Sequence, residues 1–206
     1  MAEELDGCHV GLGRCLGLVH DHIGDIEIQC CWTRPGNREL ILTGNLSSVS
    51  REAIWNIKDL VQQSIPGISS RLGLCAEGLS LIKQGHDLHV HVENGFHPVG
   101  PSYQMGAIYL SMVSLLISQR PRKDVVVLGD VGNATGAFSS AWDVGQSYMG
   151  YCQQLGYRHV ILGDGTNVTP EAEIAAGQIQ GDGQPLVRLT FIRNILDALS
   201  LCFHVS

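Results

Sequence analysis

Short apolar runs separated by turn residues occupy the first part of the chain. Residues 15–19, 26–32 and 39–42 are rich in apolar and β-branched side chains, and His22-Ile-Gly and Arg34-Pro-Gly-Asn stand between them. Runs of this length favour strands, and glycine, proline and asparagine at these positions favour turns. The pattern predicts three strands in an antiparallel meander.

The apolar spacing then changes from that of a strand to that of a helix. Ile54, Ile57 and Val61 recur three or four residues apart, which places them on one face of a helix over residues 50–64. A proline inside a helix removes a hydrogen bond and clashes with the preceding turn. We therefore expect Pro66-Gly67 to end this helix.

The middle of the chain predicts one strand and one buried helix. Residues 87–92 alternate between polar and apolar side chains, as in a strand with one covered face. Residues 93–101 carry glycine and proline and are expected to form a loop. Residues 103–117 are almost wholly apolar, so the helix that they predict must lie in the core.

Strands and helices alternate in the second half, an order typical of an α/β domain. We expect strands at residues 125–128, 159–162 and 186–191, and helices at residues 144–155, from residue 169, and at 192–201. Thr169-Pro170-Glu171 supplies an N-cap, a proline in the first turn and an early acidic residue. Since no linker or repeat interrupts the pattern, we predict a single domain over residues 1–206, with its core at about 8–203.

Composition narrows the classes of partner. The chain has 206 residues, 44% of them hydrophobic, and its formal net charge is −7 with no run of Lys or Arg. That is enough apolar material for a sizeable core, and the charge argues against a nucleic-acid partner. The longest apolar stretch is too short to cross a bilayer, and the acidic N-terminus is unlike a signal peptide. We expect a soluble, intracellular protein without membrane contact.

The seven cysteines are an odd number and include no CxxC pair. Most of them lie inside apolar segments, where a free thiol behaves as a small hydrophobic side chain. We predict reduced core thiols rather than disulfides. We also expect no metal site and no cofactor.

Residues 95–102 carry the candidate chemistry of the chain. The sequence lacks the phosphate-binding, nucleophile-elbow and zinc-binding motifs of several large enzyme classes. Gly95-Phe-His-Pro-Val-Gly-Pro-Ser102 instead leads directly into the predicted buried helix. A serine there would lie near the helix N-terminus, where backbone N–H groups can stabilise an oxyanion. Ser102 is therefore the candidate nucleophile.

A series of short motifs resembles the proteolytic domain of the Lon peptidases. The motifs, which run in the family's order over about residues 10–201, are Leu42-Thr-Gly-Asn-Leu46, Asp87-Leu-His-Val-His-Val92, Gly100-Pro-Ser102, Val113-Ser-Leu-Leu116, Asp124-Val, Gly129-Asp130 and His159-Val-Ile-Leu162. The resemblance implies an α/β (α+β) domain of the Lon proteolytic type, with the ribosomal protein S5 domain 2-like fold. It also implies a serine peptidase with a Ser-Lys dyad.

In that family a serine attacks the peptide carbonyl, and a lysine on the following helix removes the serine proton. The lysine is kept partly desolvated, so that its pKa is low enough for a base near neutral pH. The resemblance places Ser102 at the serine position. An alignment without gaps from residues 113–116 places Tyr103 there instead, and Tyr103-Gln-Met-Gly106 replaces the family's Ala-Gly. Both residues are kept as candidates.

The lysine of the dyad has no counterpart. The resemblance places its position at Gln146, or at Ser147 or Tyr148 with a different gap. The chain has only three lysines, and none lies on the helix that should face Ser102: Lys58, Lys83 and Lys123. A threonine that helps to orient the family's dyad is replaced by Leu128. Because serine needs an adjacent base, this loss should lower the rate by several orders of magnitude.

Four histidines near the serine loop allow a substitute base or a metal site: His86, His89, His91 and His97. The family also has histidines at positions like His89 and His91, which favours a structural role for them. Asp124 and Asp130 match acidic residues of the family, and turns or surface contacts explain them as well as chemistry does. For the three tryptophans packing is favoured over a ligand surface: Trp32, Trp55 and Trp142.

We therefore hypothesise a degenerate Lon-type serine peptidase domain that is proteolytically inactive and acts in binding or assembly. The alternative is an active serine endopeptidase of the Lon family that uses Ser102 with a substitute base such as His97. A ligand-binding domain of the wider superfamily is disfavoured by the acidic charge and the missing phosphate loop. The resemblance implies a homo-oligomer, a hexamer in the family. Because no AAA+ ATPase module is expected in this sequence, a separate ATPase or a protein substrate is the expected partner.

Overall fold

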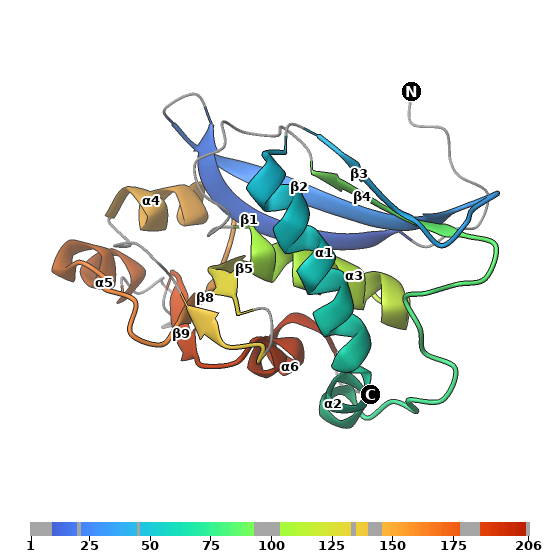
Figure 1. Cartoon of the computed structure of the whole chain (residues 1–206). Helices are drawn as coiled ribbons and strands as arrows, with labels where there is room; N and C mark the ends of the chain where they lie inside the picture. The colour runs from blue at the N-terminus through green and yellow to red at the C-terminus, as the bar shows by residue number, and fades with distance from the viewer. Residues whose placement is uncertain are drawn as a thin grey trace.

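A computed structural model describes residues 10–19, 22–44, 46–92, 104–132, 135–139, 146–177 and 186–204, without the side chains of residues 17–19, 22–24 and 146. Two main sheets and the helices around them make up this part of the chain (Figure 1). The first sheet contains β1 (Gly11–Val19), β2 (His22–Thr33), β3 (Leu40–Thr43) and β4 (Asp87–Val92). The second contains β5 (Val125–Leu128), β8 (His159–Gly163) and β9 (Arg188–Ile192). The mixture of helices and strands confirms the predicted α/β class.

The first sheet has the strand order β1-β2-β4-β3. Strands β1 and β2 form an antiparallel hairpin, in which Val19 lies opposite His22. Strand β4 pairs antiparallel with β2, and β3 pairs parallel with β4. The predicted meander is therefore correct for the first two strands and wrong for the third, because a strand distant in sequence takes the place beside β2. The turn predicted at His22-Ile-Gly is also wrong, since these residues belong to β2.

One face of this sheet packs on helix α3 (Met105–Ile117). Every residue of α3 from 105 to 116 is buried, which confirms the predicted core helix. The contact between β1 and α3 depends on glycine. A Cβ atom on Gly13 would lie 2.0 Å from the carbonyl oxygen of Ala107, and one on Gly11 would lie 2.1 Å from that of Ser111. The backbone of β1 therefore lies directly against the helix.

Helix α1 (Ser48–Gln63) packs beside α3 and starts at a serine cap, where the Ser47 side chain accepts a hydrogen bond from the backbone N–H of Ser50. Its buried side chains include the predicted Ile54, Ile57 and Val61. Pro66 does not close the helical region, as the sequence suggested, but lies in the first turn of a second helix, α2 (Ile65–Leu72). A first-turn residue has no partner for its N–H, so proline is tolerated there.

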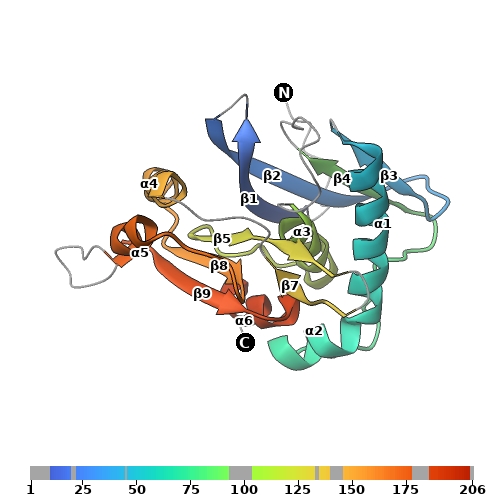
Figure 2. The same cartoon turned by 60° about the vertical axis from the view of Figure 1, so that its left-hand side comes forward.

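The second sheet is parallel throughout and has apolar side chains on both faces. Val125 and Val127 belong to the large core cluster that includes α3, whereas Val126 and Leu128 belong to a second cluster. Helices α4 (Gln146–Gln154) and α5 (Pro170–Gly177) contribute to that second cluster and lie beside β8 and β9 (Figure 2). Burial on both faces explains why β5 and most of β8 read as continuous apolar runs, whereas β9 at the edge of the sheet is partly exposed.

Two shorter features differ from the sequence-based predictions. A small antiparallel pair, β6 (Asp130–Val131) and β7 (Phe138–Ser139), follows β5 and was not predicted. The predicted helix over residues 192–201 starts later, as the 3-10 helix η2 (Ile195–Ala198) followed by α6 (Leu199–Cys202). The side chain of Asn194 accepts a hydrogen bond from the backbone N–H of Leu196 and so caps this helical segment.

The cysteine prediction is correct in part. Six cysteines lie in the described residues and all are free; Cys8 lies outside them. Four of the six are buried as predicted: Cys15, Cys30, Cys152 and Cys202. Cys31 is half-buried and Cys75 is exposed, so these two are not core thiols. None of the helices described is long and apolar enough to cross a membrane.

Candidate functional site

The first turn of α3 is fixed to the C-terminal end of β5. The backbone N–H of Gly106 donates a hydrogen bond of 3.2 Å to the carbonyl oxygen of Gly129. A Cβ atom on Gly106 would lie 2.9 Å from the ring of Phe138 and 3.0 Å from Val127, so only glycine permits this approach. The start of the helix that follows Ser102 in sequence is thus held against the strand end at Gly129.

Helix α4 packs on the other side of the same strand. Its Met149 and Cys152 are fully buried in the second cluster, together with Leu128 from the end of β5 and Leu16 from β1. Leu128 itself is 0% exposed. At the position where the family resemblance has a threonine, this chain therefore places a buried aliphatic side chain without a hydroxyl group.

The predicted nucleophile positions cannot be placed in this arrangement. Ser102 and Tyr103 lie outside the described residues, as do His97 and Trp142. The backbone of Gln146 is described and forms the first residue of α4, but its side chain is not. The choice between Ser102 and Tyr103, and their distance from Gln146, stay predictions.

All three lysines lie in the described residues, and each belongs to another part of the fold. Lys58 is on α1, where its Nζ lies 4.7 Å from the ring centroid of Trp55. Lys83 precedes β4, and its Nζ lies 4.2 Å from the ring centroid of Trp32. Lys123 directly precedes β5. None of them is on α4 or in the first turn of α3.

The three tryptophans were expected to pack rather than form a ligand surface, and the two that are described differ. Trp32 is partly buried against the core, and its Nε1 donates a 3.1 Å hydrogen bond to the carbonyl oxygen of Leu81. Trp55 is 45% exposed on α1. Packing therefore accounts for Trp32, while Trp55 lies at the surface beside Lys58.

Two of the four histidines share a hydroxyl group on the outer face of the first sheet. The Oγ1 atom of Thr43 lies 2.8 Å from Nε2 of His89 and 2.9 Å from Nδ1 of His91. Burial, with a smaller contribution from His91, lowers the pKa of His89. His86 lies before β4, where it contacts Arg34 and the carbonyl oxygen of Gln84. Within the described residues no group of three or more His, Cys, Asp or Glu could hold a metal ion.

The two acidic residues of interest have different surroundings. Arg122 donates to both carboxylate oxygens of Asp124, at 3.1 and 2.7 Å, and this hydrogen bonding lowers the pKa of Asp124. Asp130 follows Gly129 and accepts a 2.8 Å hydrogen bond from the backbone N–H of Val131. Its burial raises its pKa. Asp124 is thus in a surface ion pair, whereas Asp130 is a half-buried carboxyl group beside the point where α3 and β5 meet.

Comparisons with known proteins agree on one family. A family model described as the Lon protease (S16) C-terminal proteolytic domain matches residues 3–162. A Lon protease of Xanthomonas oryzae pv. oryzae is 34% identical over 122 residues, which are 58% of this chain and 13% of that protein. A Lon protease of Phenylobacterium zucineum is 34% identical over 121 residues, 58% of this chain and 14% of that protein.

A plant protein matches to a similar extent. The peroxisomal Lon protease homolog 2 of Spinacia oleracea is 31% identical over 124 residues, 58% of this chain and 13% of that protein. The match thus spans about one seventh of the length of these relatives.

Proposed function

Because the chain belongs to the family of Lon protease C-terminal proteolytic domains, we propose that it is a degenerate serine peptidase domain, proteolytically inactive, which acts in binding or assembly. A peptidase of the Ser-Lys type needs a base that removes the proton of the serine hydroxyl. The proposal is that this chain has kept the framework of the domain and lost that base.

The composition and position of helix α4 carry the proposal. The helix begins at Gln146 and contains neither lysine nor arginine in its nine residues. A glutamine amide is not a base at neutral pH, so it cannot take the place of a lysine amine. The three lysines of the chain lie on α1, before β4 and before β5. A buried Leu128 at the end of β5 supports the same conclusion, because it offers no hydroxyl group to orient a dyad.

Peptide hydrolysis tests this proposal directly. We expect the chain to cleave a fluorogenic peptide library or labelled casein no faster than its Ser102→Ala variant. A fluorophosphonate probe should leave Ser102 unlabelled, as read by mass spectrometry of tryptic peptides. The Lon protease of Xanthomonas oryzae pv. oryzae is the positive control for the substrates and the probe.

The alternative of an active endopeptidase gives the opposite result. Hydrolysis by the wild type above the Ser102→Ala background, together with a probe adduct on Ser102, would overturn the proposal. His97→Ala would then show whether histidine is the substitute base. A Gln146→Lys variant is the matched gain-of-base test: labelling of Ser102 in this variant alone supports the loss of lysine as the cause of inactivity.

We also propose that the chain self-associates and that it acts with a separate AAA+ ATPase or a protein substrate. The support is the family membership, since Lon domains form hexamers. Light scattering coupled to size exclusion tests self-association. A monomer at every concentration between about 1 and 100 µM would contradict it.

A further inference from the structure

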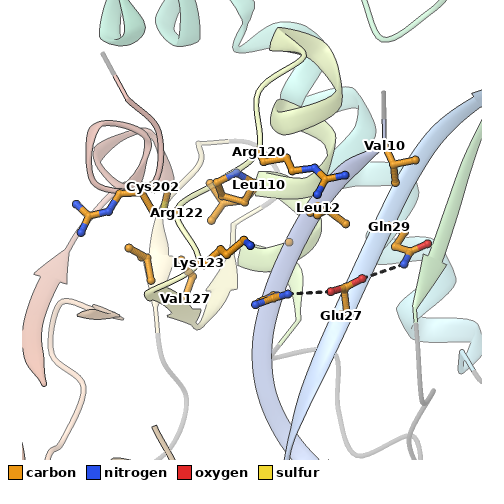
Figure 3. A pocket seen from close by; sticks show the side chains of 14 residues that line it. Val10, Leu12, Glu27, Gln29, Leu110, Arg120, Arg122, Lys123, Val127 and Cys202 are labelled. Atoms are coloured by element: carbon orange, nitrogen blue, oxygen red, sulfur yellow. Dashed lines mark hydrogen bonds and ion pairs between the residues drawn. The ribbon is translucent and has the colours of Figure 1, made fainter. Parts of the chain in front are cut away.

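A cleft of about 360 Å³ opens between the two sheets, near the C-terminal end of α3 (Figure 3). Strands β1 and β2 form one wall, and the segment between α3 and β5 forms the other. This segment follows the last turn of α3, whereas Ser102 precedes the first turn. None of the described residues that line the cleft lies on α4, the helix that begins at Gln146.

Apolar side chains form the floor of the cleft. Leu110 from α3 and Val127 from β5 line it and are only 3% and 1% exposed. Leu12 on β1 is half-buried and lines the opposite wall. The volume lies within the range of small-ligand pockets, which are mostly apolar and carry a few polar groups that orient the ligand.

The rim of the cleft carries two cations that have no counter-ion among the described residues. Arg120 and Lys123 are exposed and extend into the cleft from the segment between α3 and β5 (Figure 3). In the described part of the chain neither side chain has a hydrogen bond or an ion pair. Arg122, which lies between them in sequence, differs because it is held by Asp124 at 2.7 Å. An anion in the cleft would have Arg120 and Lys123 as its partners.

The acidic group that lines the cleft is already neutralised. Glu27 accepts hydrogen bonds from Nη2 of Arg14 at 3.2 Å and from Nε2 of Gln29 at 2.9 Å. It therefore does not compete for Arg120 or Lys123. In a chain whose formal net charge is −7, this leaves a locally positive cleft above an apolar floor.

We propose that this cleft binds a small amphipathic anion, with its carboxylate or other acidic head between Arg120 and Lys123 and its hydrocarbon body on Leu12, Leu110 and Val127. The apolar floor selects for the hydrocarbon, because burying it removes apolar surface from water. The cations select for the charged head. A purely apolar ligand would leave the two cations unpaired, and a small inorganic anion would leave the apolar floor uncovered.

Isothermal titration of the full chain with decanoate and with decanol tests both halves of the proposal. We expect decanoate to bind with a stoichiometry of one and decanol to bind at least about tenfold more weakly. The double variant Arg120→Gln/Lys123→Gln should weaken decanoate binding by at least about tenfold. Leu12→Trp, which puts a larger side chain on the wall opposite the floor, should also weaken decanoate binding.

The matched control removes two other exposed cations from a cavity that shares Arg122 with the cleft. Arg158 and Arg188 line a neighbouring cavity with His159, and Arg158→Gln/Arg188→Gln should leave decanoate binding unchanged. Circular dichroism confirms that all variants are folded. The proposal fails if decanoate does not bind, if decanol binds equally well, or if the control pair weakens binding as much. It also fails if Arg120→Gln/Lys123→Gln changes only the oligomeric state in light scattering, which would make the cleft a contact between copies.

Discussion

The hydroxyl group of Tyr157 donates a hydrogen bond of 2.8 Å to Oδ1 of Asp25, a residue 132 positions earlier in the chain. This bond joins the segment before β8 to strand β2, and so connects the two sheets. Tyr157 is 2% exposed. Burial, with the nearby charge of Asp25, raises the pKa of Tyr157, so the phenol remains a proton donor at neutral pH.

Tyr157→Phe should lower the free energy of unfolding by about 1–2 kcal/mol, because it leaves a partly buried carboxylate without this donor. Urea denaturation followed by circular dichroism measures the change. Tyr151→Phe is the control, since it removes a half-buried phenol on α4 and should change stability by less than about 0.5 kcal/mol. Equal effects of the two substitutions would show that the bond to Asp25 contributes nothing.

Gly13→Ala should destabilise the protein severely, by at least about 3 kcal/mol. The added methyl group would lie 2.0 Å from the carbonyl oxygen of Ala107, so β1 and α3 would have to separate. Gly150→Ala is the opposite case. It lies on α4 with nothing within 4 Å of its added Cβ, and we expect it to stabilise by about 0.5–1 kcal/mol.

Thermal melting of these two glycine variants gives the comparison. The expected order of melting temperature is Gly150→Ala, wild type, Gly13→Ala. A Gly13→Ala variant that melts at the wild-type temperature would show that β1 does not lie directly against α3 at Gly13.

The stability of the protein should rise with pH between about 5 and 7, partly through His159. Burial lowers the pKa of His159, the positive charges of Arg188 and Arg122 lower it further, and Asp124 opposes them. In the unfolded chain the imidazole has its ordinary pKa near 6.5. Below that pH the unfolded state binds the proton more readily than the folded state does, so acid favours unfolding. Each such group contributes at most about 1.4 kcal/mol per pH unit.

Urea denaturation at several pH values measures this slope. His159→Gln keeps a polar partner for Thr190, whose Oγ1 lies 2.7 Å from Nε2 of His159, and should reduce the slope. Part of the slope should remain in this variant, because the pKa of His89 is also lowered and His89 changes stability in the same direction. A slope unchanged by His159→Gln, or stability that falls between pH 5 and 7, contradicts the prediction.

Cys75 should react quickly with a thiol reagent in the native state, whereas the buried cysteines should react only on unfolding. Cys75 is the exposed member of the six cysteines described. Burial raises the pKa of Cys30 and of Cys202 to about 12, so these thiols are protonated as well as inaccessible. The assay counts thiols with Ellman's reagent in a Cys8→Ser background, with Cys75→Ser as the paired variant. Labelling of the Cys8→Ser/Cys75→Ser variant at the rate of the Cys8→Ser background would contradict the prediction, because the fast thiol would then be the half-buried Cys31 or a buried cysteine.

The sequence was most informative where a segment is buried on all sides. The strand at residues 125–128 has both predicted ends, because a continuous apolar run needs burial on every face. The buried helix ends at the predicted residue 117 but starts at Met105 rather than at residue 103. The partner of β3 was not predictable in the same way. Nothing in residues 39–42 indicates that β4, rather than β2, lies beside them, since pairing depends on contacts distant in sequence.

Sequence motifs predicted the family and the candidate peptidase residues, but not the cleft. They led to the family, and the count of lysines led to the expectation that no lysine lies on the helix after the Ser102 loop. The cleft at Arg120 and Lys123 carries no motif, because Leu12 and Arg14 complete it from more than a hundred residues earlier in the chain. Only the fold brings these side chains together.

The position of β4 between β2 and β3 sets the order in which the sheet can be completed. During synthesis from the N-terminus, β1 and β2 can pair as soon as both have left the ribosome, since they are neighbours in sequence. Strand β3 emerges next and has no strand to pair with until residues 44–86 have followed and β4 appears. Until then the nascent chain carries an unpaired strand edge, the kind of surface that invites aggregation or a chaperone.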